Sequence, residues 1–235
     1  SGSGVDALPL AKAAELGISV HNTPESIAES VAEHAVSLLF AMAHTVVEGD
    51  RNARRGKWFD GLNLTRWHLT GRTLGLVGYG RIARHVERMV AGFRMKVIHF
   101  DPFVPDSMPL RELLAAADFV SLHCPLTPET RHLIGEAEFR LMKRNAILVN
   151  TSRGPVVDEK ALIDALKNGI IGGAALDVTD PEPPEKDNPL LQMENVIVTP
   201  HYAPTTVESA TRVSKIAAEN INAVLAGQEP VGRIV

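Results

Sequence analysis

The sequence predicts an α/β fold built on a doubly wound parallel sheet. From Thr73 onward, short apolar runs alternate with amphipathic stretches, which is the pattern of repeated strand–helix–strand units. The apolar runs are also continuous rather than alternating, as expected of parallel strands that helices cover on both faces. At 235 residues, the chain is long enough for one large domain of this kind, or for one and a fraction.

Six of the apolar runs are predicted to be strands. They span residues 73–78, 95–100, 118–123, 146–150, 172–178 and 195–199. Helices are expected between them at residues 81–93, 110–117, 136–143 and 158–169, and the last of these has an acidic start and a glycine stop.

The chain before Thr73 follows a different pattern. Residues 8–17 predict a helix ended by glycine, residues 18–20 a short strand, and residues 26–50 one long amphipathic helix. A polar arm with Trp58 and Trp67 follows, and a subunit contact explains it better than a nucleic-acid contact because the chain is negative overall. The last predicted element is a helix over residues 205–227.

Composition and charge narrow the class of protein. With 45% hydrophobic and 22% charged residues, the composition is that of an ordinary globular protein. The net charge of -4 gives no sign of the excess basic charge that nucleic-acid binding requires. No apolar stretch of the sequence reaches the length of a membrane span. The single cysteine, Cys124, cannot form an intrachain disulfide, and no secretory signal is visible, so we expect a cytoplasmic protein.

A dinucleotide site is predicted at the first strand-to-helix turn. Gly78, Gly80 and Ala83 stand in a GxGxxA frame, where they permit a tight turn, close approach to a pyrophosphate and close helix packing. Such glycines often serve only the turn. However, Asp101 ends the second strand about twenty residues on, where an acid binds the adenosine ribose of NAD and repels the 2′-phosphate of NADP. The combination predicts NAD as the cofactor.

Three further strand ends carry residues suited to carbonyl reduction. Polar residues stand at or just past the ends of three predicted strands, and such ends converge on one crevice. They are Arg153, Asp177 with Glu182, and His201. Hydride delivery to a keto carbon requires a proton donor, which His201 could supply with Glu182 orienting it. Arg153 could bind a carboxylate through its guanidinium fork. Taken singly, each has a plainer interpretation as a surface charge or a loop residue.

At this point the chain resembles the D-2-hydroxyacid dehydrogenase family, which includes phosphoglycerate, glyoxylate/hydroxypyruvate and D-lactate dehydrogenases. The resemblance rests on stretches such as VAEHAVSLLFAMA, GRTLGLVGYGRIA, SLHCPLTPETRHLIG, NTSRGPVVDEKALIDAL and GGAALDVTDPEPP, which occur in one order. It implies an NAD-dependent oxidoreductase that transfers hydride between NAD(H) and a small 2-keto or 2-hydroxy acid, on a Rossmann-type domain with a smaller flavodoxin-like substrate domain. No metal site is predicted.

The resemblance also implies residue roles, position by position. Arg153, Glu182 and His201 match the catalytic residues of the family. The cofactor residues fall into four groups: turn residues over the pyrophosphate, the ribose ligand, the adenosine side, and the nicotinamide end. In chain order the matches are Gly78, Gly80, Arg81, Ile82, Asp101, Cys124, Pro125, Thr151, Ser152 and Asp177, of which Asp177 pairs with the nicotinamide carboxamide.

The same resemblance divides the chain into domains. Residues 1–21 are a remnant of the substrate domain, residues 22–202 form the dinucleotide-binding domain with a dimerisation helix and arm at 27–68, and residues 203–235 form the helix returning to the substrate domain. In the family, roughly a hundred residues of substrate domain precede the point where this chain starts. Without those residues the substrate would not be shielded from water, so we expect a chain that binds NAD and turns substrate over weakly or not at all. The opening SGSG is either a native loop that touches substrate and cofactor or a cloning scar.

Other functions remain open on the sequence. An NAD-sensing interaction protein, similar to the corepressors on this scaffold, would keep the Arg, Glu and His, although HYAPTT lacks the tryptophan that such proteins carry after the histidine. A formate dehydrogenase would place Gln where Glu182 stands. The helix from Ile27 to Val47 and the tryptophan arm predict a homodimer, and the loop sequences favour glyoxylate or hydroxypyruvate without naming the acid.

Overall fold

A parallel sheet of six strands is the main element of the protein in its computed structural model, which describes residues 4–5, 8–23, 25–58 and 66–235. The chain divides into two compact units. The larger unit is Ala32–His201, and the smaller unit combines Ser1–Val31 with Tyr202–Val235. The domain bounds expected from the sequence stay a prediction.

The sheet confirms all six predicted strands. They are β1 (Thr73–Val77), β2 (Lys96–Phe100), β3 (Phe119–Leu122), β4 (Ile147–Asn150), β5 (Gly173–Leu176) and β6 (Val196–Val198). Their order across the sheet is β2-β1-β3-β4-β5-β6, and all neighbours are parallel. From β1 the chain adds β2 on one side, and from β3 it adds β4, β5 and β6 on the other side. The sheet is therefore doubly wound, and the strand order reverses between β1 and β3.

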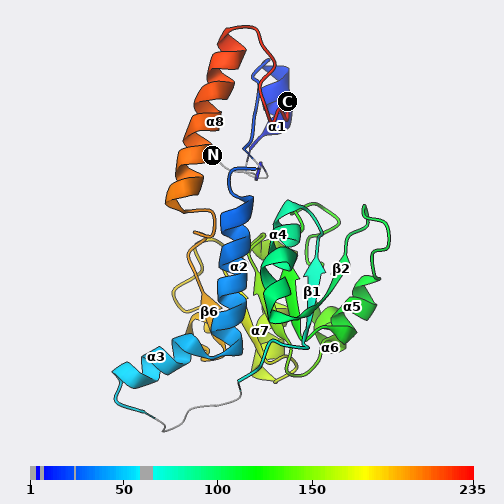
Figure 1. Ribbon diagram of the computed structural model, residues 1–235, viewed down its shortest axis with the longest axis vertical. Helices are drawn as coiled ribbons and strands as arrows, with labels where there is room; N and C mark the ends of the chain where they lie inside the picture. Colours follow the sequence, from blue (N-terminus) through cyan, green and yellow to red (C-terminus); the bar gives the residue numbers. More distant parts are fainter. Residues whose placement is uncertain (1–3, 6–7, 24, 59–65) are drawn as a thin grey trace. The chain divides into compact units, whose positions relative to one another are not determined.

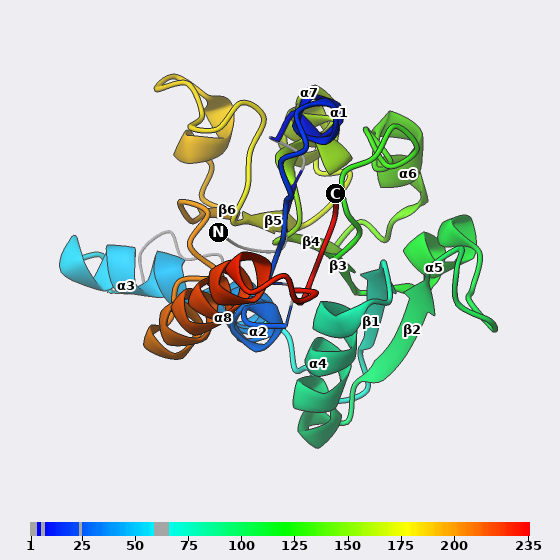
Figure 2. The same cartoon turned by 90° about the horizontal axis from the view of Figure 1, so that it is seen from above.

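Helices cover both faces of the sheet, as Figure 2 shows from above. One face carries α5 (Leu110–Ala116), α6 (Glu136–Leu141) and α7 (Glu159–Lys167). The other carries α2 (Ala28–Ala43) and α4 (Arg81–Val90), with a short η1 turn (Ala91–Phe93) after α4. Because each strand is buried from both sides, β3, β4 and β5 have no exposed position, which explains their continuous apolar runs.

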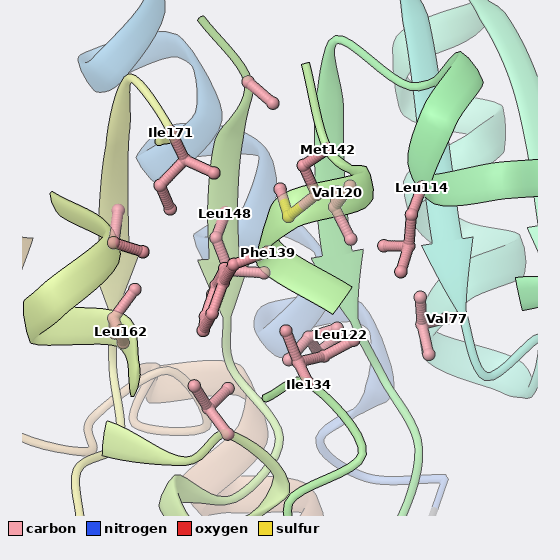
Figure 3. Packing of buried hydrophobic residues seen from close by; sticks show 14 of the residues in the cluster. Val77, Leu114, Val120, Leu122, Ile134, Phe139, Met142, Leu148, Leu162 and Ile171 are labelled. Atoms are coloured by element: carbon pink, nitrogen blue, oxygen red, sulfur yellow. The ribbon is translucent and has the colours of Figure 1, made fainter. Parts of the chain in front are cut away.

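The core beneath α5, α6 and α7 is the larger of the two clusters (Figure 3). Phe139 of α6 and Leu162 of α7 are almost fully buried among the apolar strand residues Val120, Leu122 and Leu148. A buried side chain of this size contributes about 1.5–3 kcal/mol to folding, so this layer fixes the helices over the sheet. Two short 3-10 turns, η2 (Gly154–Val156) and η3 (Pro189–Gln192), complete the connections on the way to β5 and β6.

The prediction of one long helix over residues 26–50 was wrong. The chain forms α2 and then a separate helix α3 (Val46–Arg54), and the two axes differ by 60°. Thr45 at the break has a left-handed backbone with φ 51°. The backbone N–H of Trp67 donates to the carbonyl oxygen of Ala43 at 2.9 Å, so a distant residue satisfies the end of α2.

The smaller unit consists of α1 (Leu10–Glu15), the long helix α8 (Val207–Leu225) and the two chain segments beside them (Figure 1). The chain end runs along the N-terminal segment, where Ile234 N–H donates to Val20 O and Asn22 N–H donates to Gly232 O. The strand predicted at residues 18–20 is absent, and a single antiparallel bridge joins His21 to Arg233 instead. Of the opening loop, residues 1–3 lie outside the described residues.

Within the described part of the chain, no single helix combines the length and apolar character of a membrane span. The bent pair of α2 and α3 meets that test only when counted together, by length and composition.

Candidate active site

The strand ends form one row along the carboxyl edge of the sheet. The register pairs Val77 with both Phe100 and Leu122, Leu122 with Asn150, Asn150 with Leu176, and Leu176 with Val198. Every residue that follows these strands therefore leaves the sheet at the same edge. The site residues predicted in the larger unit all lie at this edge or in the loops that start from it.

The glycine turn lies at the switch point. Gly78 has φ 85°, and a Cβ atom there would stand 2.5 Å from the backbone nitrogen of Cys124, which follows β3. Only glycine lets these two strand ends approach so closely. Gly80 differs, since its backbone is extended and a Cβ would have no heavy atom of the described chain within 4 Å. The open space at Gly80 borders the N-terminus of α4, where Arg81 and Ile82 begin the helix.

That open space suits a diphosphate, because the first N–H groups of an α-helix and its dipole attract anions. Asp101 is fixed beside the same turn. Its Oδ2 accepts from Tyr79 N–H at 2.8 Å, and its Oδ1 accepts from Phe103 N–H at 2.9 Å. The carboxylate is thus oriented by two backbone bonds, one of them from within the glycine turn itself.

Tyr79 also supports this end of the site. Its ring stacks on His99 with centroids 3.9 Å apart, and the guanidinium of Arg84 lies 4.3 Å from the ring centroid. The hydroxyl donates to Glu87, and this bond raises the pKa of Tyr79. The sequence analysis did not single out Tyr79, although its place inside the GxG frame was a usable signal.

The end of β3 supplies Cys124 and Pro125. Cys124 is buried, and the loss of hydration raises the pKa of its thiol to about 11, so the thiol stays neutral and apolar. Pro125 is exposed. His123, between the strand and this pair, is buried enough to lower its pKa to about 4, and its Nε2 lies 2.9 Å from Ser121 Oγ. This wall of the site therefore carries no charge near neutral pH.

A tight turn after β4 holds Thr151, Ser152 and Arg153. Asn150 organises it, because its side-chain oxygen accepts from Ser152 N–H at 3.0 Å and from Ser152 Oγ at 2.9 Å, while its Nδ2 donates to the Arg153 carbonyl at 2.9 Å. Asn150 is buried and was missed as a functional residue. Thr151 Oγ1 is buried without a hydrogen-bond partner among the described residues. A buried hydroxyl in that state is available to bond a bound cofactor or an ordered water molecule.

Gly154 brings the Arg153 turn against the loop that carries Glu182. A Cβ atom on Gly154 would stand 1.9 Å from the carbonyl oxygen of Thr179, so any side chain there would separate the two loops. Within the loop that carries Glu182, Thr179 N–H donates to Glu182 Oε1 at 3.3 Å. The guanidinium of Arg153 donates through Nη1 to Ser152 O at 2.8 Å. Arg153 and Glu182 are therefore delivered by two loops in direct contact.

His201 meets Glu182 as expected. Its Nδ1 lies 2.8 Å from Glu182 Oε2, and both side chains are 38% exposed. The backbone of His201 is left-handed, with φ 50°, which costs about 1–2 kcal/mol in a non-glycine residue. Its N–H donates to Asp177 O at 2.8 Å, and this bond helps to hold the strained residue in place. Such a pair leaves the Nε2 edge of the ring for proton transfer.

Asp177 follows β5 and is only 1% exposed. Its Oδ1 accepts from Thr199 Oγ1 at 2.6 Å, and His34 Nε2 on α2 lies 3.4 Å from the same oxygen. Neither Thr199 nor His34 was predicted as a site residue. Thr199 stands two residues before His201, and this proximity could have indicated it as a site residue. His34 lies far away in the sequence, and nothing near it indicated a role in the site.

The residues present fit a nicotinamide dinucleotide along the whole edge. The open space at Gly80, the oriented carboxylate of Asp101 and the unpartnered Thr151 hydroxyl are three separate features that such a cofactor would use. The acid–imidazole pair stands beyond Asp177, at the far end from the glycine turn. The edge can thus hold a dinucleotide and move a proton beside it.

Known proteins agree with this geometry. Residues 36–203 match the family model of the D-isomer specific 2-hydroxyacid dehydrogenase, NAD binding domain. A glyoxylate reductase of Korarchaeum cryptofilum is 46% identical over 97% of this chain and 72% of its own length. A D-3-phosphoglycerate dehydrogenase of Methanocaldococcus jannaschii is 43% identical over 97% of this chain and 45% of its own.

Among solved structures, the TT0316 protein of Thermus thermophilus superposes with a TM-score of 0.93 at 43% identity, covering 100% of this chain and 77% of the other. The fold, the geometry of the site and the relatives all indicate the same family. The chain belongs to the D-isomer specific 2-hydroxyacid dehydrogenases, oxidoreductases that bind NAD(P) and transfer hydride on 2-hydroxy acids.

Proposed function

We propose that the chain reduces a small 2-keto acid, with glyoxylate or hydroxypyruvate as the first candidates, and that His201 is its acid/base residue. The observation that carries the proposal is the 2.8 Å contact between His201 Nδ1 and Glu182 Oε2. Glu182 accepts a hydrogen bond from Nδ1–H and orients the ring, so that Nε2 can donate a proton to the keto oxygen. The similarity to a glyoxylate reductase supports the choice of substrate.

The other residues divide the remaining tasks. NADH, when bound, supplies the hydride that adds to the keto carbon. Arg153 pairs with the substrate carboxylate and stabilises the charge that develops on the keto oxygen. Asp177 accepts from the nicotinamide carboxamide and fixes which face of the ring meets the substrate. Asp101 binds the adenosine ribose and disfavours a 2′-phosphate, so NADH is the preferred cofactor over NADPH.

The test is oxidation of NADH, followed by absorbance, against glyoxylate, hydroxypyruvate, pyruvate and 3-phosphohydroxypyruvate. His201→Ala should lower turnover at least about 100-fold and leave the Kd of NADH within about threefold, since only proton transfer is lost. Glu182→Gln should give an intermediate loss. His85→Ala is the matched control and should match the wild type, because His85 is a part-exposed residue of α4 whose Nδ1 lies 2.9 Å from Arg88 Nη2.

Equal loss of turnover and NADH affinity in His201→Ala would contradict the assigned role. NADH binding without oxidation by any of the four acids would instead favour the NAD-sensing alternative.

We also propose a cytoplasmic homodimer whose small-molecule substrate is its main partner. Trp58 is 69% exposed, and Val46 at the start of α3 is also exposed, which supports a subunit contact around this helix and arm. Part of the predicted arm, residues 59–65, lies outside the described residues. The net charge of -4 gives no reason to expect a nucleic-acid or membrane partner. A single monomeric species in sedimentation at micromolar concentration would contradict the dimer.

A further inference from the structure

A three-residue polar chain leads from α2 to the nicotinamide end of the site. His34 Nε2 lies 3.1 Å from Thr199 Oγ1, which lies 2.6 Å from Asp177 Oδ1. His34 comes from the second helix and Thr199 follows the last strand, 165 residues away in sequence. The His34 side chain is only 14% exposed, so water competes little for these bonds.

The distances favour one direction for each bond, and the tautomer of His34 is assigned from them. Thr199 Oγ1 has one proton, and the short 2.6 Å separation indicates that it is donated to the carboxylate of Asp177. The same hydroxyl oxygen then accepts, so His34 carries its proton on Nε2. From there His34 also faces Asp177 Oδ1 at 3.4 Å. Both neutral and charged forms of the imidazole can make this donation.

The backbone beside the chain is equally restrained. Asp177 N–H donates to Asn150 O at 2.9 Å, and Thr199 N–H donates to Leu176 O at 2.8 Å. These bonds restrain the peptide of Asp177, and the rotation of its side chain is restrained by Thr199 and His34. A buried carboxylate needs hydrogen-bond donors, and Thr199 and His34 provide them on one oxygen.

We propose that His34, acting through Thr199, is a positioning residue that sets the side-chain orientation of Asp177 for the nicotinamide carboxamide. This rests on the proposed function, in which Asp177 binds that carboxamide. His34 is thereby a determinant of affinity for the nicotinamide half of the cofactor and has no part in binding the adenosine half. If His34 served only core packing, its substitution would lower the affinity for both halves of the cofactor, because it would destabilise the fold.

The experiment compares the binding of NADH with that of ADP-ribose, which lacks the nicotinamide, by calorimetry, and it adds the emission spectrum of bound NADH. His34→Leu keeps the bulk and loses the donor, whereas His34→Gln keeps a donor at a similar reach. Thr199→Val removes only the bridging hydroxyl. Thermal unfolding of each variant shows whether the fold is intact.

For His34→Leu and Thr199→Val, we expect the Kd of NADH to rise about tenfold, as for one lost hydrogen bond to a charged group. The Kd of ADP-ribose should stay within about twofold, and His34→Gln should bind NADH within about threefold of the wild type. Because both residues act on the same oxygen of Asp177, the double variant should lose less NADH affinity than the sum of the two single variants.

The inference is overturned if His34→Leu binds NADH like the wild type. It is equally overturned if NADH and ADP-ribose weaken together, or if a folded His34→Gln is no better than His34→Leu. Failure of the proposed function would appear separately, in the wild-type chain, as no binding of NADH or as binding without oxidation by any of the four keto acids.

Discussion

Alanine substitutions at the two glycines of the turn after β1 should have different effects. Gly78→Ala should destabilise the fold, whereas Gly80→Ala should weaken the binding of NADH. Gly78→Ala places its Cβ 2.5 Å from Cys124 N and 2.8 Å from Cys124 Cα, which are backbone atoms that cannot move aside alone. At φ 85° the alanine is also strained by about 1–2 kcal/mol. With about 1–3 kcal/mol for the overpacking, the free energy of unfolding should fall by about 2–5 kcal/mol.

Gly80→Ala should leave the fold nearly unchanged. The backbone there is extended at φ -79°, and a Cβ meets no atom of the described chain within 4 Å. Loss of the preferred helix cap costs at most about 1 kcal/mol. The methyl group instead occupies the space that the diphosphate needs, so the Kd of NADH should rise by about 100-fold or more, the loss of one to two charged hydrogen bonds.

Urea unfolding and NADH fluorescence titration measure the two effects separately. Gly56→Ala is a control for Gly78→Ala, because Gly56 has φ 70° with no neighbour within 4 Å and isolates the backbone strain. If Gly80→Ala unfolds as easily as Gly78→Ala, or if it binds NADH as well as the wild type, the assignment of these two roles is refuted.

Two further predictions concern buried polar bonds outside the acid–imidazole pair. Asn150→Leu should lower the free energy of unfolding by about 1–3 kcal/mol, because Ser152 N–H and Arg153 O lose their partner, and it should raise the KM of the keto acid more than the Kd of NADH. At Asp118, partial burial opposes ionisation, but bonds from Thr73 N–H and Lys143 and the charge of Arg72 lower the pKa below 3.8. A lowered folded pKa stabilises above the unfolded value, so Asp118→Asn should cost about 1 kcal/mol at neutral pH. In urea unfolding this difference should vanish as the pH falls from 3.8 through the lower folded pKa, and a difference that persists there would contradict the ion pairing.

The sequence predicted the sheet because its signals are local. Each strand is a short run of apolar residues that both helix layers cover, and each run ends where the chain must leave the sheet. The glycine frame and Asp101 were predicted for the same reason: the turn, the helix start and the second strand lie within thirty residues of one another. The contact of Glu182 with His201 was also predicted, since both follow neighbouring parallel strands.

The break between α2 and α3 was not predictable from this stretch. No proline or glycine stands at His44 or Thr45, and the apolar periodicity continues through both. What ends α2 is the bond from Trp67 N–H to Ala43 O, together with the left-handed backbone of Thr45. The donor lies beyond the end of α3, and helix propensity in residues 26–50 holds no information about it.

The same limit separates the predicted site residues from those that were missed. His201, Glu182 and Arg153 could be identified because each lies in a loop that follows a strand, and such loops converge at one edge of the sheet. His34 sits within a buried amphipathic helix, where a histidine is ordinarily a packing residue, and only the fold brings it to Thr199 and Asp177. The proposed catalytic residues lie in loops that follow strands, whereas His34, which we propose orients Asp177, comes from a helix packed against the sheet. The first set can therefore be inferred from spacing, and the second requires the register of the sheet and the placement of α2 upon it.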